Sequence, residues 1–71
     1  MKVRIVELPP MIARSEIEKF FPGVLKRATL AKLASQGRGP RFVKLGRKVV
    51  YPTRELLAWL EEQGVEIETV G

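Results

Sequence analysis

The sequence predicts a small α+β domain with three short helices and a two-stranded β-hairpin between the second and third helices. Three observations support this fold class. Apolar residues recur at helical spacing in three stretches, and Gly and Pro residues separate those stretches. Between the second and third stretch, two short runs rich in β-branched and aromatic residues flank a glycine. The 71 residues suffice for one domain with a thin hydrophobic core.

Both ends of the chain carry alternating patterns. Residues 1–11 are expected to form an N-terminal arm or an edge strand, because Val3 and Ile5 alternate with charged residues before Pro9 and Pro10. An edge strand there would pair with the tail, residues 64–71. The tail also alternates, and it could be a short strand, an oligomer contact or an ordered extension.

Residues 12–63 are expected to form the core of the domain. The first helix is predicted to begin at Ser15, since Ser15 and Glu18 have the spacing of a capping box. Pro22 and Gly23 end this helix. Its predicted buried stripe consists of Ile17, Phe20 and Phe21.

The second helix is predicted from Lys26 to Gln36, and the Pro-Gly turn before it makes a helix-turn-helix arrangement. Leu30, Leu33 and Ala34 recur at i, i+3 and i+4 and form the apolar stripe. The opposite face has small or polar side chains, which would let a nucleic acid approach closely and offer it hydrogen-bond donors. These residues are Ala28, Thr29, Ala31, Lys32, Ser35 and Gln36.

A β-hairpin is predicted from residues 41–45 and 49–51. Gly46 supplies the positive φ of a tight turn, and Arg47 and Lys48 form the tip. Phe42 and Tyr51 are expected in the core. After Pro52, Thr53 is predicted to cap a third helix from Arg54 to about Gln63. The apolar stripe of this helix is Leu56, Leu57, Trp59 and Leu60.

Charge is distributed unevenly along the chain. Residues 26–54 hold nine Lys or Arg residues and no acidic residue, whereas all eight Glu residues lie outside that stretch. A folded surface with this much uncompensated positive charge predicts a polyanionic partner.

The residue types also narrow the function classes. The chain has no Cys, His or Asp, which excludes Cys/His zinc sites and catalysis by a His base or a Cys nucleophile. We therefore expect a non-enzyme without cofactor or metal. No apolar run is long enough for a membrane span.

Three segments together resemble the small excisionase-type and AlpA-like phage regulators. These belong to a winged helix-turn-helix group that includes the DNA-binding heads of MerR-type regulators. The segments are residues 29–33, 36–51 and 56–60. The resemblance covers about residues 12–63 and implies a sequence-specific double-stranded DNA-binding protein. Such a protein would act in transcription regulation or in excision of a prophage or mobile element, in the cytoplasm of a bacterium.

In proteins of this kind the second helix enters the major groove, and the hairpin, or wing, contacts the backbone or the minor groove. The implied DNA-binding residues lie on that helix, at its exit and on the hairpin. They are Arg27, Ala28, Thr29, Lys32, Arg38, Arg41, Lys44, Arg47 and Lys48. Two features depart from the family pattern: Lys26 stands where relatives have a capping Ser, and the acidic tail has no counterpart.

Two further functions compete with DNA binding. The basic face could bind an acidic partner protein, as in a protein-interaction adaptor. RNA binding is less favoured, because no aromatic platform is expected on that face. Besides DNA, the candidate partners are a second copy of the chain, in a dimer or a cooperative array, and a phage integrase.

Overall fold

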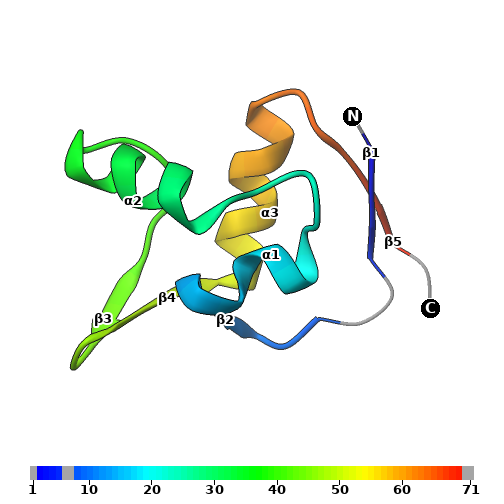
Figure 1. Ribbon diagram of the computed structural model, residues 1–71. Helices are drawn as coiled ribbons and strands as arrows, with labels where there is room; N and C mark the ends of the chain where they lie inside the picture. The colour runs from blue at the N-terminus through cyan, green and yellow to red at the C-terminus, as the bar shows by residue number, and fades with distance from the viewer. Residues whose placement is uncertain (1, 6–7, 70–71) are drawn as a thin grey trace.

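The computed structural model describes residues 2–5 and 8–69, and the remaining parts of the expected arm and tail lie outside the described residues. The fold is α+β, with three α-helices and a three-stranded antiparallel sheet in the described ranges. Figure 1 shows α3 (Thr53–Glu62) in the middle of the molecule. Helix α2 (Arg27–Ser35) lies on one side of it, and a parallel pair of strands lies on the other.

The antiparallel sheet has the strand order β2–β4–β3. Strands β3 (Val43–Leu45) and β4 (Lys48–Pro52) form the hairpin between α2 and α3. The predicted two-stranded hairpin is therefore present, but strand β2 (Met11–Ala13) pairs with the other edge of β4 and adds a third strand that the sequence analysis did not predict. A strand of only three residues, such as β2, shows too little alternation in the sequence to be predicted without knowledge of its pairing strand.

The hairpin turn is tighter and one residue earlier than predicted. Leu45 opposes Lys48, which leaves Gly46 and Arg47 as the two turn residues. Gly46 has φ +63°, the conformation that glycine tolerates best. Lys48 is therefore the first residue of β4 rather than part of the tip.

The first helical segment is short and lacks the predicted capping box. A 3-10 helix, η1 (Arg14–Glu16), follows β2 directly and continues into the single turn of α1 (Ile17–Phe20). Neither start has a side-chain cap hydrogen bond. Because η1 follows β2 without a break, Ser15 lies inside it rather than ahead of a helix. The Glu18 carboxylate instead faces Arg27 on α2.

After α2 the chain turns back and passes close to the last residues of that helix. The amide of Arg38 donates to the carbonyl of Leu33 at 2.8 Å, and Gly37 and Gly39 both have positive φ. A Cβ on Gly39 would lie 3.0 Å from the Cβ of Leu33, so the chain passes close to the helix here. Glycine is required at this approach for both φ and space.

Helix α3 begins at Thr53, and Pro52 occupies its N-cap. The predicted Thr53 cap was wrong, because the Thr53 hydroxyl donates to the carbonyl of Pro9 instead. The Thr53 amide donates to the carbonyl of Pro10 at 2.9 Å. Thr53 is buried and thus ties the segment before β2 to the start of α3.

The hydrophobic core gathers residues from the three α-helices, from strands β2 and β4, and from the turn between α1 and α2. Its buried members are Ile12, Ile17, Phe21, Leu25, Leu30, Tyr51, Leu56 and Leu60. Trp59 is partly buried against this cluster, as a structural residue would be. Phe42, which was expected in the core, is 37% exposed.

The two ends of the described chain meet in a second, parallel pair of strands. Strand β1 (Lys2–Ile5) pairs with β5 (Glu66–Thr69) in a register that opposes Lys2 to Glu66. This pair lies on the side of α3 away from α2 and the hairpin (Figure 1). No helix in the described ranges is both long enough and apolar enough to cross a membrane.

Candidate nucleic-acid interface

Helix α2 carries the first part of the candidate interface. Leu30 is buried and anchors the helix on the core. At about 100° per residue, Ala28 and Lys32 lie roughly opposite Leu30, on the outer face of the helix. Ala28, Thr29 and Lys32 are all exposed. The first turn holds no acidic residue, so this face offers small side chains and positive charge.

The hairpin lies beside the N-terminal half of α2, and the two enclose a hollow of about 370 Å³. Of the site residues predicted from the sequence, Arg27 and Ala28 line it from α2, and Arg47 and Lys48 line it from the hairpin. Residues from the end of β2 and from η1 close it. The other lining residues are Ala13, Arg14, Ser15, Ala31 and Val49. The structure therefore brings part of α2 and the hairpin turn together, as a grip on one ligand would require.

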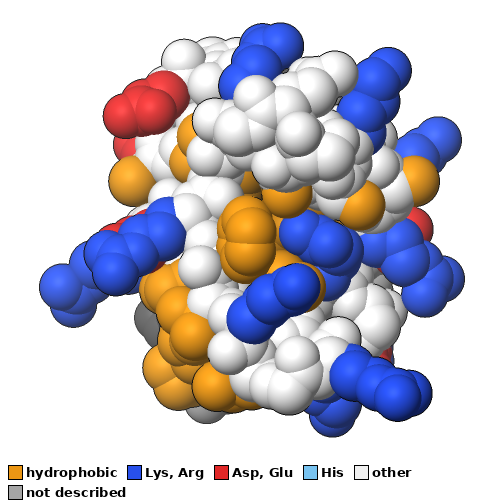
Figure 2. Space-filling view, turned by 90° about the vertical axis from the view of Figure 1, so that its left-hand side faces the viewer, with side chains coloured by type: hydrophobic (Ala, Val, Ile, Leu, Met, Phe, Trp, Pro, Cys, Tyr) orange, Lys and Arg blue, Asp and Glu red, His pale blue; other side chains and the backbone are white. Residues whose placement is uncertain are grey.

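The face that carries α2 and the hairpin is rich in positive charge. Figure 2 shows Lys and Arg side chains spread over it around a central apolar area, with carboxylates only near its margins. The apolar area agrees with the exposure of β3, all of whose residues are exposed. Leu45 is 60% exposed, and Val43 on the same strand is 37% exposed.

Two cations of the predicted site have carboxylate partners. The Nε atom of Arg27 lies 3.4 Å from Oε1 of Glu18, which joins α2 to α1. The Nη1 group of Arg41 donates to Oε1 of Glu55 at the same distance. All four side chains are more than 40% exposed, so each pair contributes little to stability. Their effect is to compensate part of the positive charge at those two positions.

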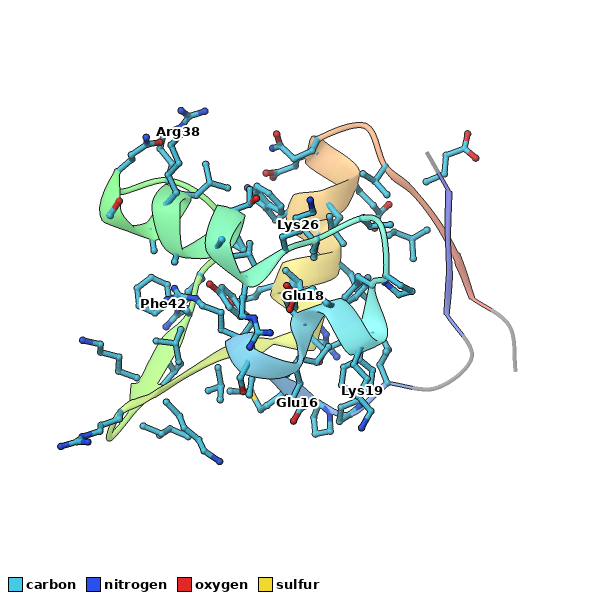
Figure 3. All side chains as sticks on the ribbon, in the orientation of Figure 1. Glu16, Glu18, Lys19, Lys26, Arg38 and Phe42 are labelled. Atoms are coloured by element: carbon cyan, nitrogen blue, oxygen red, sulfur yellow. The ribbon has the colours of Figure 1, made fainter. Side chains whose placement is uncertain are left out.

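The remaining predicted residues lie around the hollow rather than in it. Thr29 is about 100° from Ala28 around the helix, on the shoulder away from Arg27. Arg38 lies on the far side of α2 from the hairpin (Figure 3). Lys44 is exposed in β3, opposite Val49. Lys32, Arg38, Arg41 and Lys44 therefore extend the positive surface without lining the hollow.

Sequence reasoning missed Arg14, which lines the hollow from η1. Its Nε atom donates to the Tyr51 hydroxyl at 3.0 Å, and its guanidinium lies 5.6 Å from the centre of the Phe42 ring. Figure 3 shows Phe42 between α2 and the hairpin. Arg14 stands twelve positions before the cationic stretch, so no local charge pattern pointed to it.

Comparison with known proteins identifies the class of this domain. The family model described as a helix-turn-helix domain matches residues 23–64, more than half of the chain. The chain belongs to this family, which is typical of excisionase-type and AlpA-like small regulators, and the family supports DNA binding. The match begins in the turn before α2 and ends just after α3, so it includes the hairpin. No curated protein and no solved structure matches the chain.

Proposed function

We propose that the protein is a sequence-specific regulator that holds double-stranded DNA between α2 and the β3–β4 hairpin. Helix α2 enters the major groove with Ala28, Thr29 and Lys32 toward the base edges. The hairpin acts as a wing whose Arg47 and Lys48 contact the neighbouring backbone or minor groove. Its biological role is transcription regulation or excision of a prophage or mobile element, and it acts by binding rather than by catalysis.

The hollow between α2 and the hairpin carries this proposal. Arg27, Arg47 and Lys48 come from positions up to 21 residues apart and line the same space. Cations that were merely solvated would not need to converge in this way. Further cations extend the positive surface to either side of the hollow, where a bound duplex would continue. These are Lys32, Arg38, Arg41 and Lys44.

Binding of a fluorescent 24-base-pair duplex tests the proposal directly. If six to eight cations contact phosphates, the slope of log K against log salt should be near −5 to −7. Lys32→Glu and Arg47→Glu should each abolish most of the binding while the circular dichroism spectrum stays unchanged. An affinity that does not respond to salt, or full binding by both variants, would contradict the proposal.

The specificity of a single copy is limited by the small surface it can bury on DNA. We therefore propose that a dimer, a cooperative array or an integrase supplies the rest. Sedimentation on duplexes with one and two copies of a selected site would show whether the second copy binds more tightly than the first.

A protein-interaction adaptor is the second candidate, and the exposed β3 strand favours it. Val43 and Leu45 are 37% and 60% exposed on an edge strand, beside several cations. An acidic partner protein could use both features. In that case Lys32→Glu and Arg47→Glu would weaken capture of the partner, and the unmodified protein would show no affinity for duplex DNA.

A further inference from the structure

Arg14 is fixed in place more firmly than a surface arginine. Its Nε atom donates to the Tyr51 hydroxyl at 3.0 Å, and its guanidinium lies 5.6 Å from the Phe42 ring centre and 5.7 Å from the Tyr51 ring centre. The two rings meet edge to face, with centres 6.2 Å apart. Tyr51 is 1% exposed and belongs to the core, so the guanidinium is anchored to the hydrophobic core of the domain.

The Tyr51 bond uses only the Nε–H of Arg14 and leaves the terminal N–H groups available. Among the described side chains, no carboxylate forms an ion pair with Arg14. This distinguishes it from Arg27, whose charge is shared with Glu18. A half-buried guanidinium that is held by these contacts and has unused donors is suited to a carboxylate or phosphate group, two of whose oxygens it can bind through parallel hydrogen bonds.

The hollow in front of Arg14 has the size and lining of an anion site. Its volume of about 370 Å³ falls in the range of pockets that hold small ligands. Arg14, Arg27, Arg47 and Lys48 supply positive charge on several sides, and none of the residues that line the hollow is acidic. The rest of the lining includes small apolar side chains, which leave room for a group on a polymer backbone to enter. These are Ala13, Ala28, Ala31 and Val49.

We propose that one phosphodiester of the DNA backbone enters this hollow and that Arg14 binds it. The inference rests on the proposed function. A strand of backbone separates the major groove, which α2 occupies, from the minor groove next to it, which the hairpin approaches. That strand must cross the space between these two elements, and Arg14 closes the inner end of that space. Because its guanidinium is already ordered, binding costs little side-chain entropy.

The test compares two variants that each remove one positive charge. Arg14→Gln removes the proposed phosphate ligand. Lys19→Gln is the matched control, since Lys19 is exposed at the end of α1, away from α2 and the hairpin (Figure 3). The probe is the fluorescent 24-base-pair duplex, titrated at several salt concentrations, and thermal melting of each variant is followed by circular dichroism.

We expect Arg14→Gln to bind about ten- to a hundredfold more weakly, as the loss of a hydrogen-bonded charge implies. The salt slope should fall in magnitude by about 0.9, the contribution of one phosphate. Lys19→Gln should keep both the slope and the affinity nearly unchanged. If Arg14 only packed Phe42 against Tyr51, its loss would lower the melting temperature and leave the salt slope as it was, which would overturn the proposal.

Tyr51→Phe decides the case if Arg14→Gln fails to fold. It keeps the ring and removes only the hydroxyl that orients Arg14, which makes Tyr51 a positioning residue. We expect weaker binding with the salt slope retained, because the charge stays but is no longer held. Binding equal to that of the unmodified protein would refute the role of Arg14. Failure of the unmodified protein itself to bind the duplex would refute DNA binding as a whole, which is a different outcome.

Discussion

Glu18 should act as a built-in competitor of DNA for Arg27, and Glu18→Gln should therefore tighten DNA binding. The carboxylate lies 3.4 Å from Nε of Arg27, which must turn toward a phosphate when DNA enters the hollow. Breaking that pair costs part of the binding free energy. Replacing the carboxylate by an amide removes this cost and also removes a negative charge from the edge of the site.

The size of the gain follows from the exposure of the pair. The two side chains are 62% and 41% exposed, and ion pairs of this kind are worth about 0.2 to 1 kcal/mol. That range converts to a gain of about 1.4- to 5-fold in affinity, since a tenfold change corresponds to about 1.4 kcal/mol. The same loss should lower the melting temperature by a few degrees, because Glu18 links α1 to α2.

Anisotropy titration of the labelled duplex measures the gain, with Glu61→Gln as the control. Glu61 is exposed in the last turn of α3, and its substitution changes the net charge by the same amount. We expect Glu18→Gln to exceed the control in affinity at low salt. Equal gains in the two variants would mean that net charge alone is responsible. Weaker binding by Glu18→Gln would mean that the pair holds Arg27 in its DNA-binding position.

Three further substitutions test the framework around the site. Gly46→Ala forces φ +63° on a residue with a Cβ, so it should cost about 1–2 kcal/mol and lower the melting temperature by several degrees. If the hairpin contacts DNA, it should also weaken duplex binding. Thr53→Val removes the hydroxyl that donates to Pro9 and should cost about 1 kcal/mol in a urea titration, with the salt slope of DNA binding unchanged. Leu56→Ala empties a fully buried position and should cost about 2–5 kcal/mol, enough to lose most of the helical circular dichroism signal in a domain of this size.

The parts of the fold that depend on local pattern were predictable. The second helix was expected from Lys26 to Gln36 and runs from Arg27 to Ser35, because the apolar spacing and the following glycines define both ends. The hairpin and the third helix were found within two residues of their predicted limits. In each of these elements the deciding interactions join residues close in sequence.

Several features that were missed depend on residues far apart in sequence. Strand β2 exists through its pairing with β4, nearly forty residues later. The Thr53 hydroxyl donates to the carbonyl of Pro9, 44 positions away, instead of capping α3. The guanidinium of Arg14 is oriented by the hydroxyl of Tyr51, 37 positions away. The uneven charge distribution drew attention to Arg27, but its pairing with Glu18 on another helix could not be read from the sequence. Of the cations that line the hollow, Arg27, Arg47 and Lys48 were named from the sequence, and Arg14 was not.

The parallel pairing of β1 with β5 has a consequence for the order of events during synthesis. Lys2 pairs with Glu66, so β1 must wait for a strand that is synthesised 64 residues later. At about 5–20 residues per second, that delay is roughly 3 to 13 seconds. Everything from β2 to α3 precedes β5 in the chain, so these elements are all synthesised while β1 is still without a partner.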